Sequence, residues 1–429
     1  MTALTTPRPT AQVVPWAPDP MATDRLLPTR PTVAWTDHVA RLGRSPARST
    51  EQLVPSLNAT GVLGRGGAGF PTGRKVLAVA AAVARTRLPA VVVANCCEGD
   101  PTSSKDRVLV ARSPHLVIDG AVAAAVAVGA DRIVLAAGEN SATHRTLLAA
   151  AAERPGTAHE ISVVGVPHRY IASEATALVR FLNTGDARPA GKLLPIWERG
   201  VGGRPTLVDN AETLAQLALV SRFGPAWFAA VGTTAEPGTT LVSIGGAVRR
   251  PGVVEVPHGA PLRDVLACAG TAPAGWALFG GLAGRWVELS GMAGIGYSTA
   301  QLAAAGGVRG VGSVIVLPPG GCLLIETARI MHYQAQAGAR QCGPCMFGLP
   351  AIAADMTALG RGDAGALDRL RRRLPVINGR GACSHPDGAV GLAASALSAL
   401  TTHQSRHLRQ HLTAGGCQAP APVVPLGPS

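Results

Sequence analysis

The chain has 429 residues, 47% of them hydrophobic, so it is long enough for two or three domains that each bury a core. Its longest apolar stretches, residues 76–84 and 120–130, are shorter than the ~20 residues that cross a bilayer. The formal net charge of +13 reflects either an arginine-rich composition or an anionic binding partner. Because the arginines are scattered and no basic block carries interleaved aromatics, we expect the chain not to bind nucleic acid. An anionic partner would instead be a phosphate-bearing cofactor or an acidic redox protein.

The N-terminal half predicts an α/β domain. Residues 1–47 are rich in Pro, Thr and Arg and lack the apolar segment of a secretory signal, so we expect a flexible arm. After it, short β-branched runs alternate with Ala-rich helical stretches. Strands are predicted at residues 90–94, 132–137 and 160–166, and helices at residues 104–111, 116–128, 141–152 and 173–182. This alternation favours a mostly parallel sheet, and we assign residues 48–235 to the domain.

The pattern changes near residue 239. Short strands around a turn at residues 249–252, one helix at 261–267 and a strand at 312–317 predict a small α+β module, assigned to residues 236–322. The following residues, 323–416, are predicted to be helical, with interruptions at a cysteine motif and a glycine-rich loop. The Pro-rich residues 417–429 are expected to form a disordered tail.

The glycine-rich segment at residues 64–75 reads GRGGAGFPTGRK and leads into a helical pattern. Its glycines allow a backbone to approach a flat or phosphorylated ligand, and the helix start behind them offers N–H groups to anions. The segment lacks the Lys-Ser/Thr pair of a Walker A loop, and no strand precedes it as in a Rossmann fingerprint. On physical grounds alone, an ordinary turn and a ligand-binding loop are about equally supported.

The cysteines favour metal or redox chemistry over disulfides, because nothing in the chain indicates secretion. Cys342 and Cys345 form a C-x-x-C at a predicted helix start, and Cys383 lies in a distant loop. Three such thiolates can bind one iron–sulfur cluster. Zinc is the alternative, although a zinc site normally uses a second close pair of ligands.

Four sequence strings, in this order, resemble the NADH-binding flavoprotein subunit of respiratory complex I and the β-subunits of NAD-linked formate dehydrogenases and hydrogenases. They are residues 64–75, NCCEGDP at 95–101 followed by KDR at 105–107, YIASEATAL at 170–178, and GRPT at 203–206 with DNAETL at 209–214. The resemblance implies a three-part fold: an α/β flavin-binding domain with a mostly parallel sheet, a β-grasp domain of the soluble-ligand-binding type, and a C-terminal helical iron–sulfur domain.

The resemblance also implies cofactors and their contacts: FMN, a [4Fe–4S] or [3Fe–4S] cluster, and NADH as a candidate donor. The implied cofactor contacts are Gly64, Gly66, Gly67, Lys75, Asn95, Glu98, Glu174, Asn210 and Thr213. The implied nucleotide contacts are Phe70 and Asp100, and the implied metal ligands are Cys342, Cys345 and Cys383. No catalytic side chain is expected beyond the flavin itself.

The family's first cluster cysteine is replaced here by Ala339, which cannot bind iron. His385 and His332 are therefore candidates for a fourth ligand, although a single histidine is more often structural. The remaining cysteines are expected elsewhere: Cys268 and Cys322 in the core, and Cys417 at the edge of the tail.

Most departures from the family's strings fall around the nucleotide site. Cys97, Ser173, Ala175 and Asp209 stand where the family has an acidic residue, Gly, Glu and Asn, and Ala78 and Pro195 stand at aromatic positions for which Trp197 is a candidate substitute. We therefore expect NADH to reduce the flavin poorly. The adjacent Cys96 and Cys97 are interpreted either as small buried residues or as a thiol that contacts the flavin.

The function implied is electron transfer between NADH, or another donor, and a protein acceptor through FMN and the cluster. One alternative is an NADH-independent, ferredoxin-linked subunit of the Rnf type. Another is a non-catalytic β-grasp binding or scaffold protein. The expected partners are a nicotinamide nucleotide and a ferredoxin-like or other redox subunit. The expected location is the cytoplasm, with membrane contact only through a larger complex.

Overall fold

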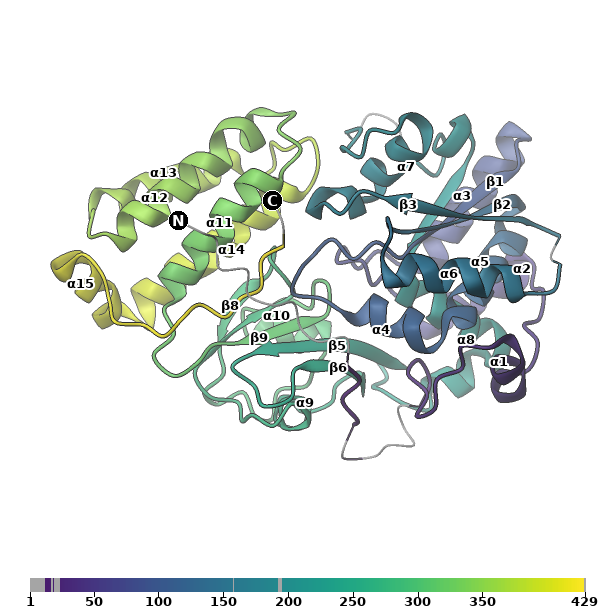
Figure 1. Ribbon diagram of the computed structural model, residues 1–429, viewed down its shortest axis with the longest axis horizontal. Helices are drawn as coiled ribbons and strands as arrows, with labels where there is room; N and C mark the ends of the chain where they lie inside the picture. Colours follow the sequence, from purple (N-terminus) through teal and green to yellow (C-terminus); the bar gives the residue numbers. More distant parts are fainter. Residues whose placement is uncertain (1–11, 17, 19–23, 157, 192–194, 428–429) are drawn as a thin grey trace.

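The computed structural model describes residues 12–16, 18, 24–156, 158–191 and 195–427. Figure 1 shows three parts: an α/β part at the right, a β-rich part below the centre and a helical part at the left. The α/β part consists of α1 (Trp35–Leu42), α2 (Thr50–Thr60), α3 (Thr72–Thr86), β1 (Ala90–Asn95), α4 (Lys105–Arg112), α5 (Pro114–Val128), β2 (Ala130–Gly138), α6 (Ala142–Glu153), β3 (Glu160–Val166), a 3-10 turn at Tyr170–Ser173, α7 (Ala175–Thr184), β4 (Thr206–Asn210) and α8 (Ala211–Ala229).

Four parallel strands form the sheet of this part in the order β3-β2-β1-β4. Side chains alternate between its faces, as the two-residue period of a strand requires. Val92 of β1 packs with α5 and α8 on one face, whereas Val91 and Val93 pack with Leu178 of α7 on the other. Because both faces are covered, β1 is apolar throughout, which explains why its sequence is a continuous valine run.

The β-rich part has a five-stranded mixed sheet in the order β6-β5-β9-β7-β8. Its elements are β5 (Thr239–Gly246), β6 (Gly252–Pro257), α9 (Leu262–Cys268), β7 (Trp276–Phe279), β8 (Arg285–Glu288), α10 (Thr299–Ala304) and β9 (Ser313–Val316). Leu266 of α9 packs on Val242 and Val254 of the sheet, so the predicted helix lies against the strands, whereas the short helix α10 was not predicted. Strands β4, β7 and β8 were not predicted from the sequence.

The helical part consists of α11 (Leu323–Ala337), a π-helical turn at Pro344–Gly348, α12 (Leu349–Gly360), α13 (Gly365–Ile377), α14 (His385–Thr402) and α15 (Ser405–Ala414). Its core joins leucines and alanines of all these α-helices with Leu278 and Trp286 of the neighbouring sheet. The predicted three-part fold is therefore confirmed.

The two termini differ from expectation where they are described. The arm contains helix α1, and Leu26 and His38 within it are fully buried, with His38 Nε2 2.8 Å from an Asp119 oxygen. The tail is also packed: the N–H groups of Val423 and Val424 donate to one Glu326 oxygen. A buried carboxylate that needs donors orders a Pro-rich segment which composition alone predicts to be disordered. Residues 1–11 and 428–429 lie outside the described residues.

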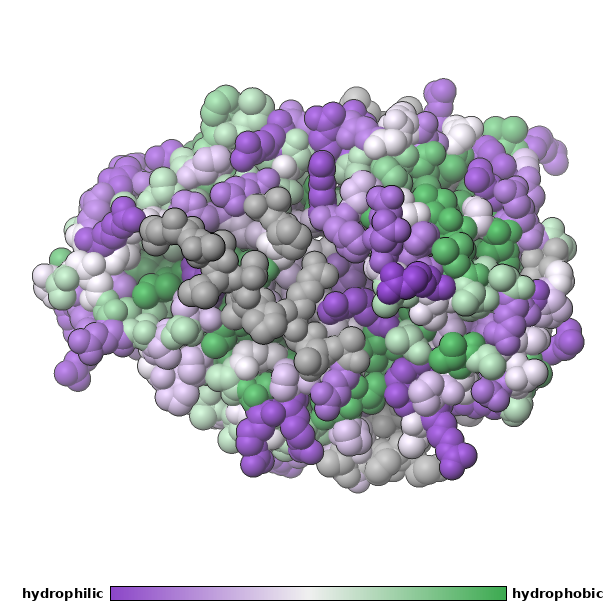
Figure 2. All heavy atoms as spheres, viewed as in Figure 1, coloured by the Kyte–Doolittle hydropathy of each residue, from purple (hydrophilic) through white to green (hydrophobic). Residues whose placement is uncertain are grey.

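Hydrophilic side chains are spread over all three parts on the face drawn in Figure 2, in line with the scattered arginines of the sequence. Among the described helices, none alone has the length and apolar character of a membrane span; α4 and α5 meet that criterion only jointly, across a 97° bend.

Candidate functional site

The glycine-rich loop lies at the carboxyl end of the parallel sheet. The chain leaves β1 toward β2 and β3 on one side, and β4 joins β1 on the other, so the strand order reverses between β1 and β4. Asn95 and Asn210 end these two strands in register with each other. The Arg65 N–H donates to Thr213 Oγ1 (2.8 Å), which fixes the loop over this edge. Open α/β sheets bind their ligands at such a switch point.

The loop's own conformation depends on glycine. Gly64 N–H donates to the carbonyl of Phe70 (2.8 Å), which closes the loop at its base. Between them, Gly67 and Gly69 have φ of +111° and +63°, values that other residues adopt only with strain. The turn leaves Phe70 about half exposed (49%) beside the sheet edge, where its ring is available for stacking.

Lys75 lies behind the loop, on α3, and reaches β4. Its Nζ donates to the carbonyl of Val208 (3.0 Å) and to Asp209 Oδ1 (2.5 Å). Burial raises the pKa of the Asp209 carboxyl, and Lys75 opposes that shift. The aspartate that replaces the family's asparagine therefore forms an ion pair with the lysine expected to contact FMN.

Asn210 is held by a buried network of charges. Its Oδ1 accepts from Lys105 Nζ (3.2 Å) and from the N–H of Glu212, and its Nδ2 donates to Asp106 (2.7 Å). Lys105 Nζ also contacts carboxylate oxygens of Asp106 (2.8 Å) and Glu212 (3.0 Å). Burial raises the pKa of Asp106 to about 6, although Lys105 opposes the shift. Asn210 thus caps α8 while its amide is fixed in one orientation.

The three predicted carboxylates are all engaged by other protein groups. Glu98 accepts from Arg107 Nε (3.1 Å), and Asp100 accepts from the N–H of Leu282 (2.8 Å) across the contact with the β-rich part. Glu174 caps the N-terminus of α7. Thr213 is likewise fully buried, and its hydroxyl faces Arg65. These positions support the site's framework, and Asp100 as a nucleotide contact stays a prediction.

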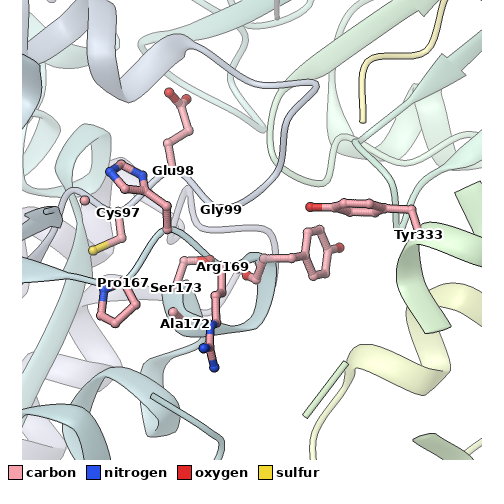
Figure 3. Close-up of a pocket in the computed structure, with 11 residues that line it drawn as sticks. Cys97, Glu98, Gly99, Pro167, Arg169, Ala172, Ser173 and Tyr333 are labelled. Atoms are coloured by element: carbon pink, nitrogen blue, oxygen red, sulfur yellow. Dashed lines mark hydrogen bonds between the residues drawn. The ribbon is translucent and has the colours of Figure 1, made fainter. Parts of the chain in front are cut away.

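A cleft opens beside these residues at the ends of β1, β2 and β3. It is lined by Cys97, Glu98, Gly99, Gly138, Pro167, His168, Arg169, Tyr170, Ala172, Ser173 and Tyr333. Figure 3 shows the Glu98 side chain pointing away from Cys97, and the Tyr333 side chain extending from the helical part toward the 167–173 segment. Tyr333 was not among the predicted site residues, because only the fold brings α11 to this cleft.

The adjacent cysteines have different environments. Cys96 is buried in the core, as the first interpretation proposed. Cys97 lines the cleft, but burial and the nearby Asp106 raise the pKa of its thiol to about 12. At neutral pH, Cys97 is therefore a neutral thiol and a poor nucleophile.

The predicted cluster cysteines come together at the C-terminal end of α11. Cys342 and Cys345 flank the start of the π-helical turn. Burial, together with the nearby Cys345 and Cys342, raises the pKa of the Cys383 thiol. The Arg340 N–H donates to Cys345 Sγ (3.4 Å), and a Cβ on Gly338 would collide with that sulfur, so the backbone wraps around it. Burial raises the pKa of the Cys345 thiol, which the Arg340 N–H opposes.

The two candidate histidines are placed differently. His385 is buried, and its Nε2–H donates to the carbonyl of Gln334 (2.9 Å). Its Nδ1 therefore carries a lone pair, and this atom has no hydrogen-bond partner in the part of the chain that is described. His332 instead contacts Thr357 Oγ1 on α12 (2.9 Å). Of the two, His385 is the better-placed candidate ligand.

These residues fit the two implied cofactors. At the sheet edge, Lys75 and the glycine backbone can face a phosphorylated ligand, and Arg107 Nη2 is a buried donor with no partner among the described residues. At the end of α11, three thiols with a backbone donor to sulfur are the donor set of an iron–sulfur cluster.

Comparisons with known proteins agree with this arrangement. The chain matches the Nuo51 FMN-binding domain over residues 57–219, the SLBB domain over 241–281 and the NADH-ubiquinone oxidoreductase-F iron-sulfur binding region over 326–407. It is 31% identical to an NADH-quinone oxidoreductase subunit of Rhizobium meliloti (strain 1021), covering 80% of this chain and 86% of the relative. It is 28% identical to the corresponding NADH-quinone oxidoreductase subunit of Streptomyces coelicolor, covering 90% of each.

Among solved structures, it resembles a chain of an NAD+-reducing [NiFe]-hydrogenase in the air-oxidised state. The TM-score is 0.78 at 25% identity, and the match covers 96% of this chain and 69% of that chain. The non-catalytic scaffold considered from the sequence is therefore not retained. The chain belongs to the family of FMN- and iron–sulfur-binding NADH-quinone oxidoreductase subunits, and it is an oxidoreductase subunit that transfers electrons by means of these two cofactors.

Proposed function

We propose that this chain is the electron-input subunit of a redox complex, with FMN held at the Asn95–Asn210 edge by the glycine loop and Lys75. The cluster would be held by Cys342, Cys345 and Cys383. When bound, FMN converts two-electron to one-electron chemistry, and the cluster carries single electrons. The chain's own residues would position the two groups.

The proposal rests on one observation, the short distance between the cleft and the residues around Cys383. Tyr170 lines the cleft, and its ring lies 5.4 Å from that of His385, two residues after Cys383. Glu174, on the same segment as Tyr170, is an electrostatic neighbour of Cys383. One short segment, 170–174, therefore forms the wall between the two sites.

NADH is proposed as a weak donor. The three predicted site carboxylates, at positions 98, 100 and 174, all accept hydrogen bonds from other groups of the protein. The half-exposed Phe70 lies beside the site. Trp197, the candidate substitute, lies instead toward the amino end of the sheet: the neighbouring Ile196 carbonyl accepts from the N–H of Thr206 at the start of β4, and Glu198 pairs with Arg85 near the end of α3. The engaged carboxylates and the small aromatic surface also favour a second candidate function, that of an NADH-independent subunit that accepts electrons from a ferredoxin-like protein. In both cases we propose a cytoplasmic location and a redox partner subunit.

We expect micromolar NADH to bleach the flavin slowly, while dithionite reduces flavin and cluster fully. Each lost aromatic stacking partner costs about 0.5–1.5 kcal/mol, and about 1.4 kcal/mol corresponds to tenfold in affinity. Stopped-flow absorbance under anaerobic conditions measures both reactions, with Phe70→Ala as the test of the remaining aromatic group. Fast bleaching at micromolar NADH would contradict weak donor binding, and recovery of FAD or of no flavin on extraction would contradict the proposed site.

We expect Asp209→Asn to tighten FMN binding about tenfold. The change removes the negative charge that pairs with Lys75, so the ammonium group is free to interact with an anionic ligand, and a hydrogen bond to a charged group contributes about 1.5–3 kcal/mol. Fluorescence titration of flavin-depleted protein with FMN measures the dissociation constant.

Lys75→Met is the matched control, since Asp209→Asn should have no effect on affinity in that background. An unchanged dissociation constant in Asp209→Asn alone would mean that Lys75 does not contact the flavin.

A further inference from the structure

Four metal-ligating side chains meet at the other end of α11 from the cluster cysteines. Cys322 caps the N-terminus of α11, His407 and His411 lie on α15, and Cys417 follows that helix. The sulfur atoms and one nitrogen of each imidazole all lie within 4.8 Å of one another. The proposed electron path uses none of them.

The distances in this group suit a single ion. Cys322 Sγ lies 3.2 Å from His407 Nε2 and 3.3 Å from His411 Nε2. A tetrahedral zinc ion with bonds of about 2.3 Å to sulfur and about 2.0 Å to nitrogen separates such ligands by about 3.5 Å. A binuclear cluster of the Rieske type binds its histidines to one iron and its cysteines to the other, which keeps nitrogen and sulfur farther apart.

Hydrogen bonds from the surrounding backbone orient two of these side chains as metal ligands. His411 Nδ1–H donates to the carbonyl of Gly360 (2.8 Å), so the lone pair is on Nε2, the atom that faces Cys322. Metal-binding histidines are usually oriented by such a second hydrogen bond. The N–H of Ile325 donates to Cys322 Sγ (3.4 Å), which favours a thiolate. His407 and His411 are four residues apart, the spacing that places both rings on one face of a helix.

We propose that Cys322, His407, His411 and Cys417 bind one Zn²⁺ ion in a closed structural site. Two thiolates balance the charge of the ion, as burial of Cys322 and His411 requires. The ion joins α11 to α15 and to the packed C-terminal segment. Since α11 has 15 residues, and is therefore about 22 Å long, this redox-inert ion lies far from the cluster cysteines at the opposite helix end.

The test uses the full chain, purified anaerobically without chelators and loaded with its cofactors. Inductively coupled plasma mass spectrometry measures the zinc content. X-ray absorption at the zinc edge, which neither iron nor flavin obscures, identifies the zinc ligands. We expect about one zinc per chain, bound by two sulfur and two nitrogen atoms. His407→Ala and Cys417→Ser should lose at least nine-tenths of the zinc and keep their flavin and iron, whereas Cys383→Ser should keep its zinc.

His403→Ala is the matched control, because His403 lies just before α15 but contacts Glu288 (3.2 Å), and this variant should keep its zinc. The X-ray absorption spectrum of the unaltered chain shows whether two sulfur and two nitrogen atoms bind zinc, even where a variant fails to fold. The proposal is overturned by a zinc-free chain with four unligated side chains, by a Cys322–Cys417 disulfide, or by zinc with a sulfur-rich shell that disappears in Cys383→Ser.

Discussion

Replacing Cys383 with serine should remove the iron–sulfur cluster while FMN stays bound. The chain offers three thiolates at this site because Ala339 cannot bind iron, so a [3Fe–4S] cluster, or a [4Fe–4S] cluster with one further ligand, depends on every one of them. Iron and acid-labile sulfide should both fall by at least tenfold. Chemical analysis and electron paramagnetic resonance of oxidised and reduced samples measure the loss, and flavin extraction measures what remains.

Cys268→Ser is the matched control, since Cys268 lies in the β-rich core with its thiol donating to the Asp264 carbonyl (3.3 Å). It should retain a full cluster. A second variant, His385→Ala, tests the fourth position: an altered resonance signal would support Nδ1 as a ligand, and an unchanged one would assign that role to another group. Full iron and sulfide in Cys383→Ser would contradict the cluster assignment at these cysteines.

The sheet and helices were predictable where hydrophobic periodicity is strong, as in the valine run of β1. The strand β4 was missed because its sequence ends in Asp209 and Asn210, polar residues whose side chains form ion pairs and caps rather than apolar contacts. The four-residue strands β7 and β8 are too short for a period-two pattern to stand out.

The candidate site was predictable at the level of motifs but not of contacts. The sequence places Glu98 and Asp100 near the flavin loop, yet their partners Arg107 and Leu282 depend on how separate elements pack. The group of Cys322, His407, His411 and Cys417 shows even more clearly that contacts depend on packing. Cys322 and His407 are 85 residues apart, so the only local signal was the spacing of the two histidines on α15, and the family resemblance had suggested a core cysteine at position 322.

Glu212→Ala should destabilise the fold by about 3–5 kcal/mol, the usual cost of stranding a buried charge. The Glu212 carboxylate contacts Lys105 Nζ (3.0 Å), and it accepts from Thr240 Oγ1 (3.0 Å) and the Leu241 N–H (3.1 Å) of the β-rich part. Without it, Lys105 keeps only Asp106 (2.8 Å) as an acidic partner, and the buried Arg65 loses the carboxylate 3.9 Å from its Nε, so positive charge is less well balanced where two parts of the fold meet. Urea unfolding followed by circular dichroism measures the change.

The effect should depend on pH in a defined direction. Burial raises the pKa of Glu212, but Lys105 and Arg65 outweigh it and hold that pKa below the ordinary 4.5. A carboxyl with a lowered pKa stabilises the fold above its unfolded-state pKa and loses that contribution as the pH falls. The difference between the unaltered chain and Glu212→Ala should therefore be constant near neutral pH and shrink below about pH 4.5.

Two comparisons separate stranded charge from lost packing. Glu198→Ala removes an exposed partner of Arg85, and should change stability by no more than about 1 kcal/mol. Glu212→Gln keeps the volume and an acceptor oxygen but removes the negative charge, so it should lose most of the stability that Glu212→Ala loses. A Glu212→Gln chain as stable as the unaltered chain would show that packing, and not charge, determines the stability of this contact between the flavin domain and the β-rich part.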